Sequence, residues 1–193
     1  MVHEQPVTGE SLRLVAAPPQ PGDVLVIDGT SDVAKLIEAG AILDGCPAAS
    51  HVAVFHHVDD AGVPWTIEGR PGGVGWADAR AYLRDPRTVA NVLQPKTAAQ
   101  RAQVCALAAK LLGTPYDWLG GIAEDAMNAL GLGALWAEKD PATGLVPGHV
   151  VCSSLAAWVY DRSGLAAPHP DDWRHVQPGD WAAWVTEQGW LHP

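Results

Sequence analysis

The residue with the clearest chemical potential in this sequence is Cys152, because its neighbours predict that it lies at the start of a helix. Residues 150–160 have helical apolar spacing and follow a segment rich in Pro and Gly. Unpaired N–H groups and the dipole at a helix start favour a thiolate, the form of cysteine that attacks a carbonyl carbon. The alternative is that Cys152 is a small buried apolar residue. Position alone leaves both interpretations open.

A cysteine nucleophile needs a base, and the base needs a group that orients it. His51 opens one predicted strand, residues 50–57, and Glu68 closes the next, residues 65–68. A two-residue turn between the strands would pair His51 with Glu68; a four-residue turn would pair it with Arg70 and leave Glu68 on the diagonal. Both turns place His51 and Glu68 on one face, whereas a three-residue turn would separate them. Taken singly, His51 could instead bond to backbone and Glu68 could be a solvated strand end.

Other polar motifs give weaker indications of a metal or cofactor site. His56 and His57 are adjacent, so we expect them to point to opposite faces at a frayed strand end and not to share a metal. The spacing of His149 and Cys152 could suit zinc, but it supplies two ligands without an obvious third. The Gly-Leu-Gly-Ala run at 131–134 lacks the preceding strand, the third Gly and the Lys of a phosphate loop. We therefore expect no metal and no cofactor.

The elements that must position these residues can be predicted from periodicity and turn signals. A turn at 21–23 precedes a buried strand at 24–27, and Ser31 or Asp32 caps a helix that runs to residue 41. The clearest helix spans 97–112, with Thr97 as its cap, Gln100 at the capping-box position and Gly113 as its stop. The weaker predictions are a loop at 70–75, a short helical turn at 76–83, a strand at 88–93 and a short helix near 181–187. Hairpin strands combined with separate helices predict an α+β fold.

Composition restricts the class of protein. The chain has 193 residues, a net charge of −10, 48% hydrophobic and 18% charged residues, which fits one folded domain and makes nucleic acid an improbable partner. We expect an N-terminal arm at 1–20 and a single domain at 21–193 with an insertion at about 119–148. Three Cys without C-x-x-C spacing argue against a disulfide framework. No signal peptide and no run of about 18 apolar residues is visible, which predicts a protein without a transmembrane segment.

Five short segments resemble the NlpC-type papain-like cysteine peptidases. They are Pro-Gly-Asp-Val-Leu-Val-Ile from residue 21, Ser-His-Val-Ala-Val-Phe from 50, Thr-Ile-Glu-Gly from 66, Leu-Gly-Thr-Pro-Tyr-Asp-Trp from 112 and Val-Cys-Ser-Ser-Leu-Ala-Ala-Trp-Val-Tyr from 151. In the usual family order the Cys precedes the His. Here His51 precedes Cys152, so the chain resembles the circularly permuted, YiiX-like branch of that family. The resemblance covers residues from about 21 to 165. It implies a papain-like fold with an antiparallel, partly barrel-like sheet packed against the nucleophile helix.

The resemblance also implies roles for four residues. Cys152 would be the nucleophile, His51 the general base and acid, and Glu68 the orienting residue. Tyr116 matches a family tyrosine that lies beside the nucleophile and helps to hold the substrate or the oxyanion. The permuted branch often has Cys-Ser-Glu where this chain has Cys-Ser-Ser from residue 152, and the insertion separates Tyr116 from Cys152 more than usual.

The expected activity is amide hydrolysis through a thioester, with peptidoglycan stem peptides as the first substrate because related enzymes often cleave them. Such cell-wall degradation, in a protein without a signal peptide, would fit a bacterial cytoplasmic protein that leaves by lysis or a component of a phage particle. One alternative is a thioesterase or acyltransferase on lipid, of the lecithin retinol acyltransferase-like type, with an apolar tunnel lined by the Trp-rich tail from residue 168. Another is a structural or binding module, such as a phage tail component with virion partners.

Overall fold

The computed structural model describes residues 18–29, 31–43, 45–84, 90–91, 94, 96–116, 150–169 and 172–189. An antiparallel sheet has the strand order β4-β3-β2-β1-β5. Its strands are β1 (Val24–Ile27), β2 (His51–Val58), β3 (Pro64–Arg70), β4 (Gly73–Asp78) and β5 (Ala90–Asn91). The helices are α1 (Asp32–Leu43), α2 (Arg80–Arg84), α3 (Ala98–Lys110), α6 (Cys152–Arg162) and α7 (Pro178–Glu187), with a 3-10 turn at Trp173–His175.

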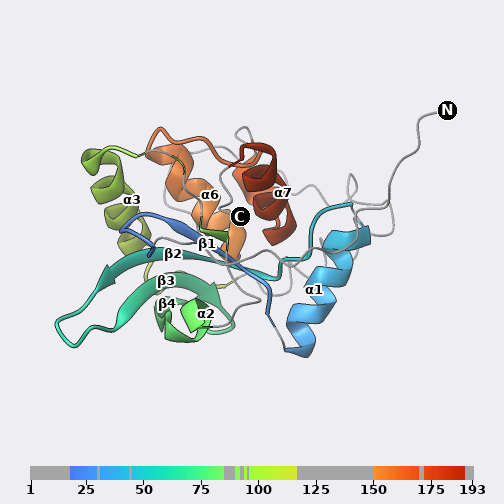
Figure 1. Ribbon diagram of the computed structural model, residues 1–193, viewed down its shortest axis with the longest axis horizontal. Helices are drawn as coiled ribbons and strands as arrows, with labels where there is room; N and C mark the ends of the chain where they lie inside the picture. Colours follow the sequence, from blue (N-terminus) through green and yellow to red (C-terminus); the bar gives the residue numbers. More distant parts are fainter. Residues whose placement is uncertain are drawn as a thin grey trace.

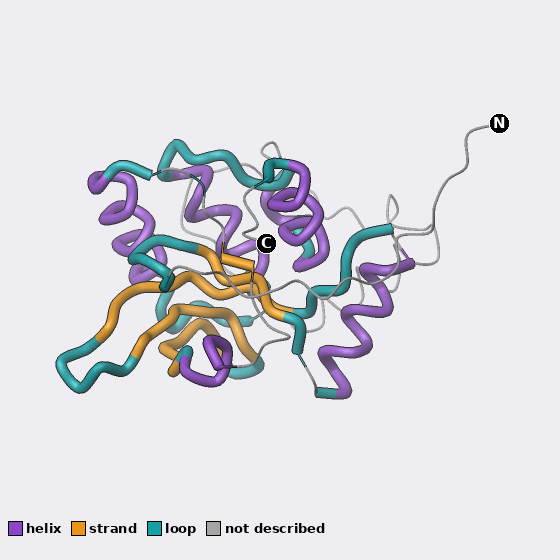
Figure 2. The backbone as a smooth tube through the Cα atoms, viewed as in Figure 1, coloured by secondary structure: helices purple, strands orange, loops and turns teal. Residues whose placement is uncertain are grey.

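Helices cover both faces of the sheet unequally. Helices α3, α6 and α7 lie together on one side and the short α2 lies on the other, as Figures 1 and 2 show. Side chains alternate along β2, so that Val52 and Val54 join the larger apolar cluster while Ala53 and Phe55 join the smaller one beside α2. The described strands form an open sheet with β4 and β5 at its edges. The α+β class expected from the sequence is therefore confirmed.

Capping residues set the helix boundaries near the positions that the sequence predicts. Thr97 caps α3 and forms the expected reciprocal capping box with Gln100. The Ser31 hydroxyl accepts a hydrogen bond from the Ala34 amide at 3.0 Å and so caps α1. Helix α6 begins at Cys152, two residues later than predicted, because Val150 forms a parallel bridge with Tyr116. This bridge fixes Cys152 as the first residue of the helix.

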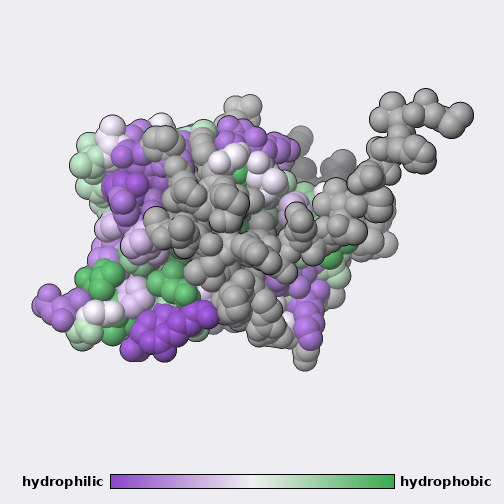
Figure 3. Space-filling model, in the orientation of Figure 1, coloured by the Kyte–Doolittle hydropathy of each residue, from purple (hydrophilic) through white to green (hydrophobic). Residues whose placement is uncertain are grey.

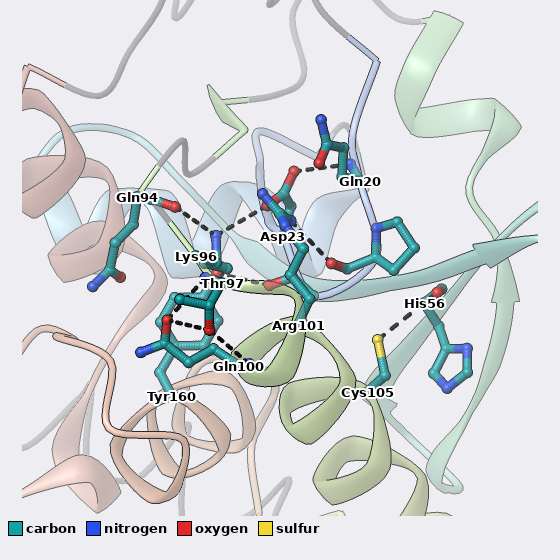
Figure 4. Close-up of polar contacts among 12 residues, drawn as sticks. Gln20, Asp23, His56, Gln94, Lys96, Thr97, Gln100, Arg101, Cys105 and Tyr160 are labelled. Atoms are coloured by element: carbon teal, nitrogen blue, oxygen red, sulfur yellow. Dashed lines mark hydrogen bonds and ion pairs between the residues drawn. The ribbon is translucent and has the colours of Figure 1, made fainter.

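A buried ionic cluster joins the start of β1 to α3. Asp23 is buried and accepts hydrogen bonds from Lys96 Nζ at 3.0 Å and from Arg101 Nη1 at 2.8 Å, as Figure 4 shows. Lys96 Nζ also lies 5.3 Å from the centre of the Tyr160 ring in α6. The cluster therefore ties the strand that pairs with β2 to the helix that carries Cys152.

The segment after Arg70 differs from its predicted structure. Residues 70–75 were expected to form a loop and 76–83 a helical turn, but β3 and β4 pair from Trp65 with Asp78 to Arg70 with Gly73. The glycines mark a tight turn, since Gly72 and Gly73 have φ of 111° and 114°, a backbone region that favours glycine. Only the short helix Arg80–Arg84 remains of the predicted turn. The predicted strand at 88–93 is described at Ala90–Asn91.

One end of the sheet exposes hydrophobic side chains. Val58 and Trp76 are exposed apolar side chains on β2 and β4, and Figure 3 shows hydrophobic surface over that end of the sheet.

None of the helices in the described ranges is long and apolar enough to cross a membrane. The predicted insertion at 119–148 and almost all of the predicted arm at 1–20 lie outside the described residues. The division into an arm and one domain stays a prediction.

Candidate active site

A bulge in β2 determines which side chains share a face with His51. Five residues, 59–63, separate β2 from β3, and the ladder begins with Val58 opposite Pro64. The register then shifts between Phe55 and His57, so that Phe55 lies opposite Thr66. Without the shift, the five-residue connection would place His51 and Glu68 on opposite faces. With it, the register is the one predicted for a four-residue turn, which keeps both side chains on one face.

The two strands stop pairing before they reach the site. Their ladder extends only as far as Val54 opposite Ile67, although β2 continues back to His51 and β3 continues to Arg70. The N-terminal end of α6 lies at this opening, because the backbone amide of Val52 hydrogen-bonds to the Cys152 thiol. The Cys152 sulfur therefore lies at the opening of the hairpin, beside the imidazole of His51.

Glu68 is a buried residue whose carboxylate contacts the other polar side chains of the site. Its carboxylate has no solvent exposure, and Oε2 lies 3.2 Å from Nε2 of His51. The hydroxyl of Tyr82, in α2, donates to Oε1 at 2.9 Å, and Arg70 donates to the same oxygen through Nε. Burial alone would raise the pKa of Glu68, but these partners, His51 first, lower it. Glu68 is therefore ionised and fixes the orientation of the imidazole.

Cys152 and His51 shift the pKa of one another in opposite directions. Burial opposes charge on both groups, yet the charge and hydrogen bond of Cys152, together with Glu68, raise the pKa of His51 to about 10. The imidazole and the N–H groups of Val52 and Ser153 lower the pKa of the Cys152 thiol. Both shifts favour a thiolate–imidazolium pair. Because Nε2 faces Glu68, Nδ1 is the ring nitrogen available to the sulfur.

Gly69 allows Tyr116 to approach the start of α6. A methyl group on Gly69 would lie 3.0 Å from Cδ2 of Tyr116 and 3.3 Å from the backbone nitrogen of Cys152. The sequence-predicted residue Tyr116 is therefore close to the backbone of Cys152, and the Tyr116–Val150 bridge holds it there. As the first helical residue, Cys152 has an N–H without an intrahelical acceptor. That N–H and the Tyr116 ring border the same small region.

This close approach makes Gly69 a test of the geometry. We expect Gly69→Ala to lower amide hydrolysis by roughly tenfold, because its methyl group would displace the Tyr116 ring or the start of α6. Gly75→Ala is the matched control: it lies on the neighbouring strand, and a methyl group there meets nothing within 4 Å. Rates for both variants, with melting temperatures, make the comparison. Equal rates for the two variants would show that the Gly69 contact is irrelevant to activity.

Comparison with solved structures supports a known fold. The chain matches the crystal structure of the metalloprotein YiiX from Escherichia coli O157:H7 (DUF1105), with a TM-score of 0.50 and 18% sequence identity over 75% of this chain. It spans 66% of the length of that neighbour. No family model and no curated protein matches this chain. The likeness shows a YiiX-like fold.

The histidine pair at the bulge differs from its prediction. His56 and His57 were expected to point to opposite faces, but their Nδ1 atoms lie 3.0 Å apart and both rings pack on Trp76. The register shift between Phe55 and His57 breaks the strict alternation of side chains, which explains the difference. His149, the other candidate zinc ligand, lies outside the described residues.

Sequence reasoning missed several of the residues that surround Glu68. Arg70 and Tyr82 bond to its carboxylate, and Gly69 makes room for Tyr116. Arg70 could have been found, because the four-residue register places it opposite His51 and two residues from Glu68. Tyr82 carried no such signal, since its contact depends on how α2 folds back beneath the sheet.

Proposed function

We propose that this chain is a cysteine hydrolase that cleaves amide bonds through a thioester intermediate, built on a circularly permuted papain-like fold of the NlpC type. The observation that carries the proposal is the line of contacts in which the Cys152 thiol hydrogen-bonds to His51 and Nε2 of His51 lies 3.2 Å from the buried Glu68 carboxylate; these contacts raise the pKa of His51 and lower that of Cys152. A preformed thiolate beside a protonated imidazole is the arrangement that nucleophilic catalysis by cysteine requires. The YiiX-like fold is consistent with it.

The first half of the reaction acylates the enzyme. The Cys152 thiolate attacks the amide carbonyl carbon, a C–S bond forms, and the carbonyl electron pair moves onto oxygen. In this proposal the N–H of Cys152 and the Tyr116 side chain stabilise the oxyanion. As the electron pair returns, the C–N bond breaks, and the His51 imidazolium gives its proton to the departing amine. The products are a free amine and a thioester on Cys152.

The second half releases the acyl group. Neutral His51 takes a proton from water, the oxygen attacks the thioester carbonyl, and the C–S bond breaks. The acid leaves, and the thiolate and imidazolium are restored. Glu68 keeps the imidazole in one orientation in both halves because its Oε2 stays bonded to Nε2. Hydrolysis should therefore weaken as the pH rises through about 10, where His51 loses the proton that the amine needs.

Peptidoglycan stem peptides remain the first substrate class that we propose, in a bacterial or phage setting. The lipid alternative needs an apolar tunnel, for which the Trp-rich tail was the candidate lining. Within the described part of the tail, Trp181 is fully buried and donates to the Ser153 carbonyl at 3.2 Å, and Trp173 and Trp184 pack against the core. The Trp181 ring therefore contacts α6, and all three rings are part of the packed core. The described part of the tail therefore gives the lipid alternative no lining for its tunnel.

The YiiX neighbour is called a metalloprotein, which raises the question of a metal here. Over the described ranges, no group of three or more His, Cys, Asp and Glu side chains is placed to hold an ion. The contacts of the site residues also point elsewhere, since His51 directs Nε2 to a carboxylate that two other side chains already bind. The proposed reaction therefore takes no step through a metal.

Thiol alkylation over a pH series tests the proposal most directly. We expect iodoacetamide to modify Cys152 with an apparent pKa below the ordinary value of about 8.5, because the imidazolium stabilises the thiolate. Cys105 is the internal comparison, since burial raises the pKa of its thiol. Peptide mapping by mass spectrometry separates the two sites. The proposal fails if Cys152 reacts near neutral pH no faster than Cys105.

A further inference from the structure

Arg70 is the exposed cation of the candidate site. Its side chain is 48% exposed, whereas the Glu68 carboxylate that it contacts is fully buried. The two residues stand two positions apart on β3 and therefore on the same face, near the end where β2 and β3 no longer pair. One carboxylate group thus separates the guanidinium from the imidazole.

The bond to Glu68 uses only part of the guanidinium. Arg70 donates through Nε, and among the described residues neither of its Nη groups has a further hydrogen-bond partner. Two Nη groups form a planar fork that matches the two oxygens of a carboxylate. Glu68 holds the base of that fork in place, so the fork is oriented before any ligand arrives. Orientation of this kind lowers the entropy cost of binding.

The charge of the chain makes this cation distinctive. The protein carries a net charge of −10, so its overall field disfavours an anionic ligand. A fixed positive fork beside the reacting groups would reverse that preference locally. Arg80, by contrast, is 49% exposed but bonds to Asp78 through both Nε and Nη2, which leaves it less able to form a forked pair.

We propose that Arg70 is a specificity residue that binds a free carboxylate on the substrate, next to the amide that is cleaved. This inference rests on the proposed amide hydrolase activity and narrows its substrate to acidic peptides. Arg70 pairs end-on with that carboxylate through its Nη groups while Nε stays on Glu68. The carbonyl to be attacked is thereby held near Cys152.

Two fluorogenic peptides test the assignment. They are identical except that the carboxyl group on the residue beside the scissile amide is free in one and a carboxamide in the other. We expect the wild-type chain to cleave the free acid with a kcat/KM roughly tenfold or more above that of the carboxamide, mainly through KM. In Arg70→Gln the ratio should fall to about one, whereas Arg80→Gln, the matched control, should keep it.

The ratio of kcat/KM for the two peptides shows whether Arg70 recognises the substrate carboxylate or only supports Glu68. Loss of the Arg70–Glu68 bond alone would slow both peptides equally and leave the ratio unchanged, which would overturn the assignment. The same conclusion follows if the wild-type chain cleaves both peptides equally well. Cleavage of neither peptide, with Cys152 alkylating like an ordinary thiol, would instead overturn the proposed activity itself and the inference with it. Circular dichroism of Arg70→Gln ensures that a folded protein is compared.

Discussion

Cys152→Ala should reduce amide hydrolysis by about 10⁴-fold or more while leaving the fold intact. In the proposed reaction the Cys152 sulfur forms the acyl bond, and the pKa of its thiol is lowered, whereas burial raises the pKa of the Cys105 thiol. The change removes only the sulfur atom from a buried helix start, so the melting temperature should shift by only a few degrees. Hydrolysis of peptidoglycan-derived peptides and thermal unfolding, measured on the same preparation, provide both readouts.

Cys105→Ala is the matched control for this experiment. Cys105 is also buried, but it lies in α3 with its thiol directed to the His56 carbonyl at 3.8 Å, and burial raises its pKa. Its loss should cost some stability and no activity. Full hydrolysis by Cys152→Ala would exclude the cysteine mechanism, and unimpaired biological performance without turnover would favour the binding-module alternative.

The His51–Glu68 contact was predicted from the strand register that a short turn would give. The structure has that register, but a longer connection and a bulge produce it. The prediction assumed a turn of two or four residues, and the actual connection has five. The bulge between Phe55 and His57 restores the parity that the extra residue would have broken. Local sequence does not reveal such a bulge, and both histidines beside it pack on Trp76, a residue of another strand.

Other differences have the same origin in tertiary contacts. Helix caps such as Thr97 depend on neighbours three residues away and were predicted correctly. The β4 strand was missed because its glycines suggested a loop, whereas they serve a tight turn and a strand that pairs along its full length with β3. Tyr82 and Gly69 matter only through partners far along the chain, so no local pattern indicates them.

Glu68→Gln should lower amide hydrolysis by about 10²-fold and move the alkaline limit of activity to lower pH. The carboxylate raises the pKa of His51 by charge and by its bond to Nε2, so the neutral amide weakens the imidazolium and, through it, the Cys152 thiolate. The amide also presents an N–H₂ group either to His51 or to Arg70, both of which need an acceptor at that point. One of the two contacts must then be lost.

Tyr82→Phe provides the graded comparison, because it removes one neutral donor to Glu68 at 2.9 Å and leaves the carboxylate charge in place. We expect a loss of only a few-fold, the size of one hydrogen bond. Rate–pH profiles of the two variants, together with the pH dependence of Cys152 alkylation, distinguish charge from packing. If Glu68→Gln and Tyr82→Phe lower the rate equally and neither shifts the profile, Glu68 merely fills space behind His51. A larger loss in Glu68→Gln, joined to a downward shift of the alkaline limit, follows only if the buried charge keeps the imidazole protonated beside the sulfur.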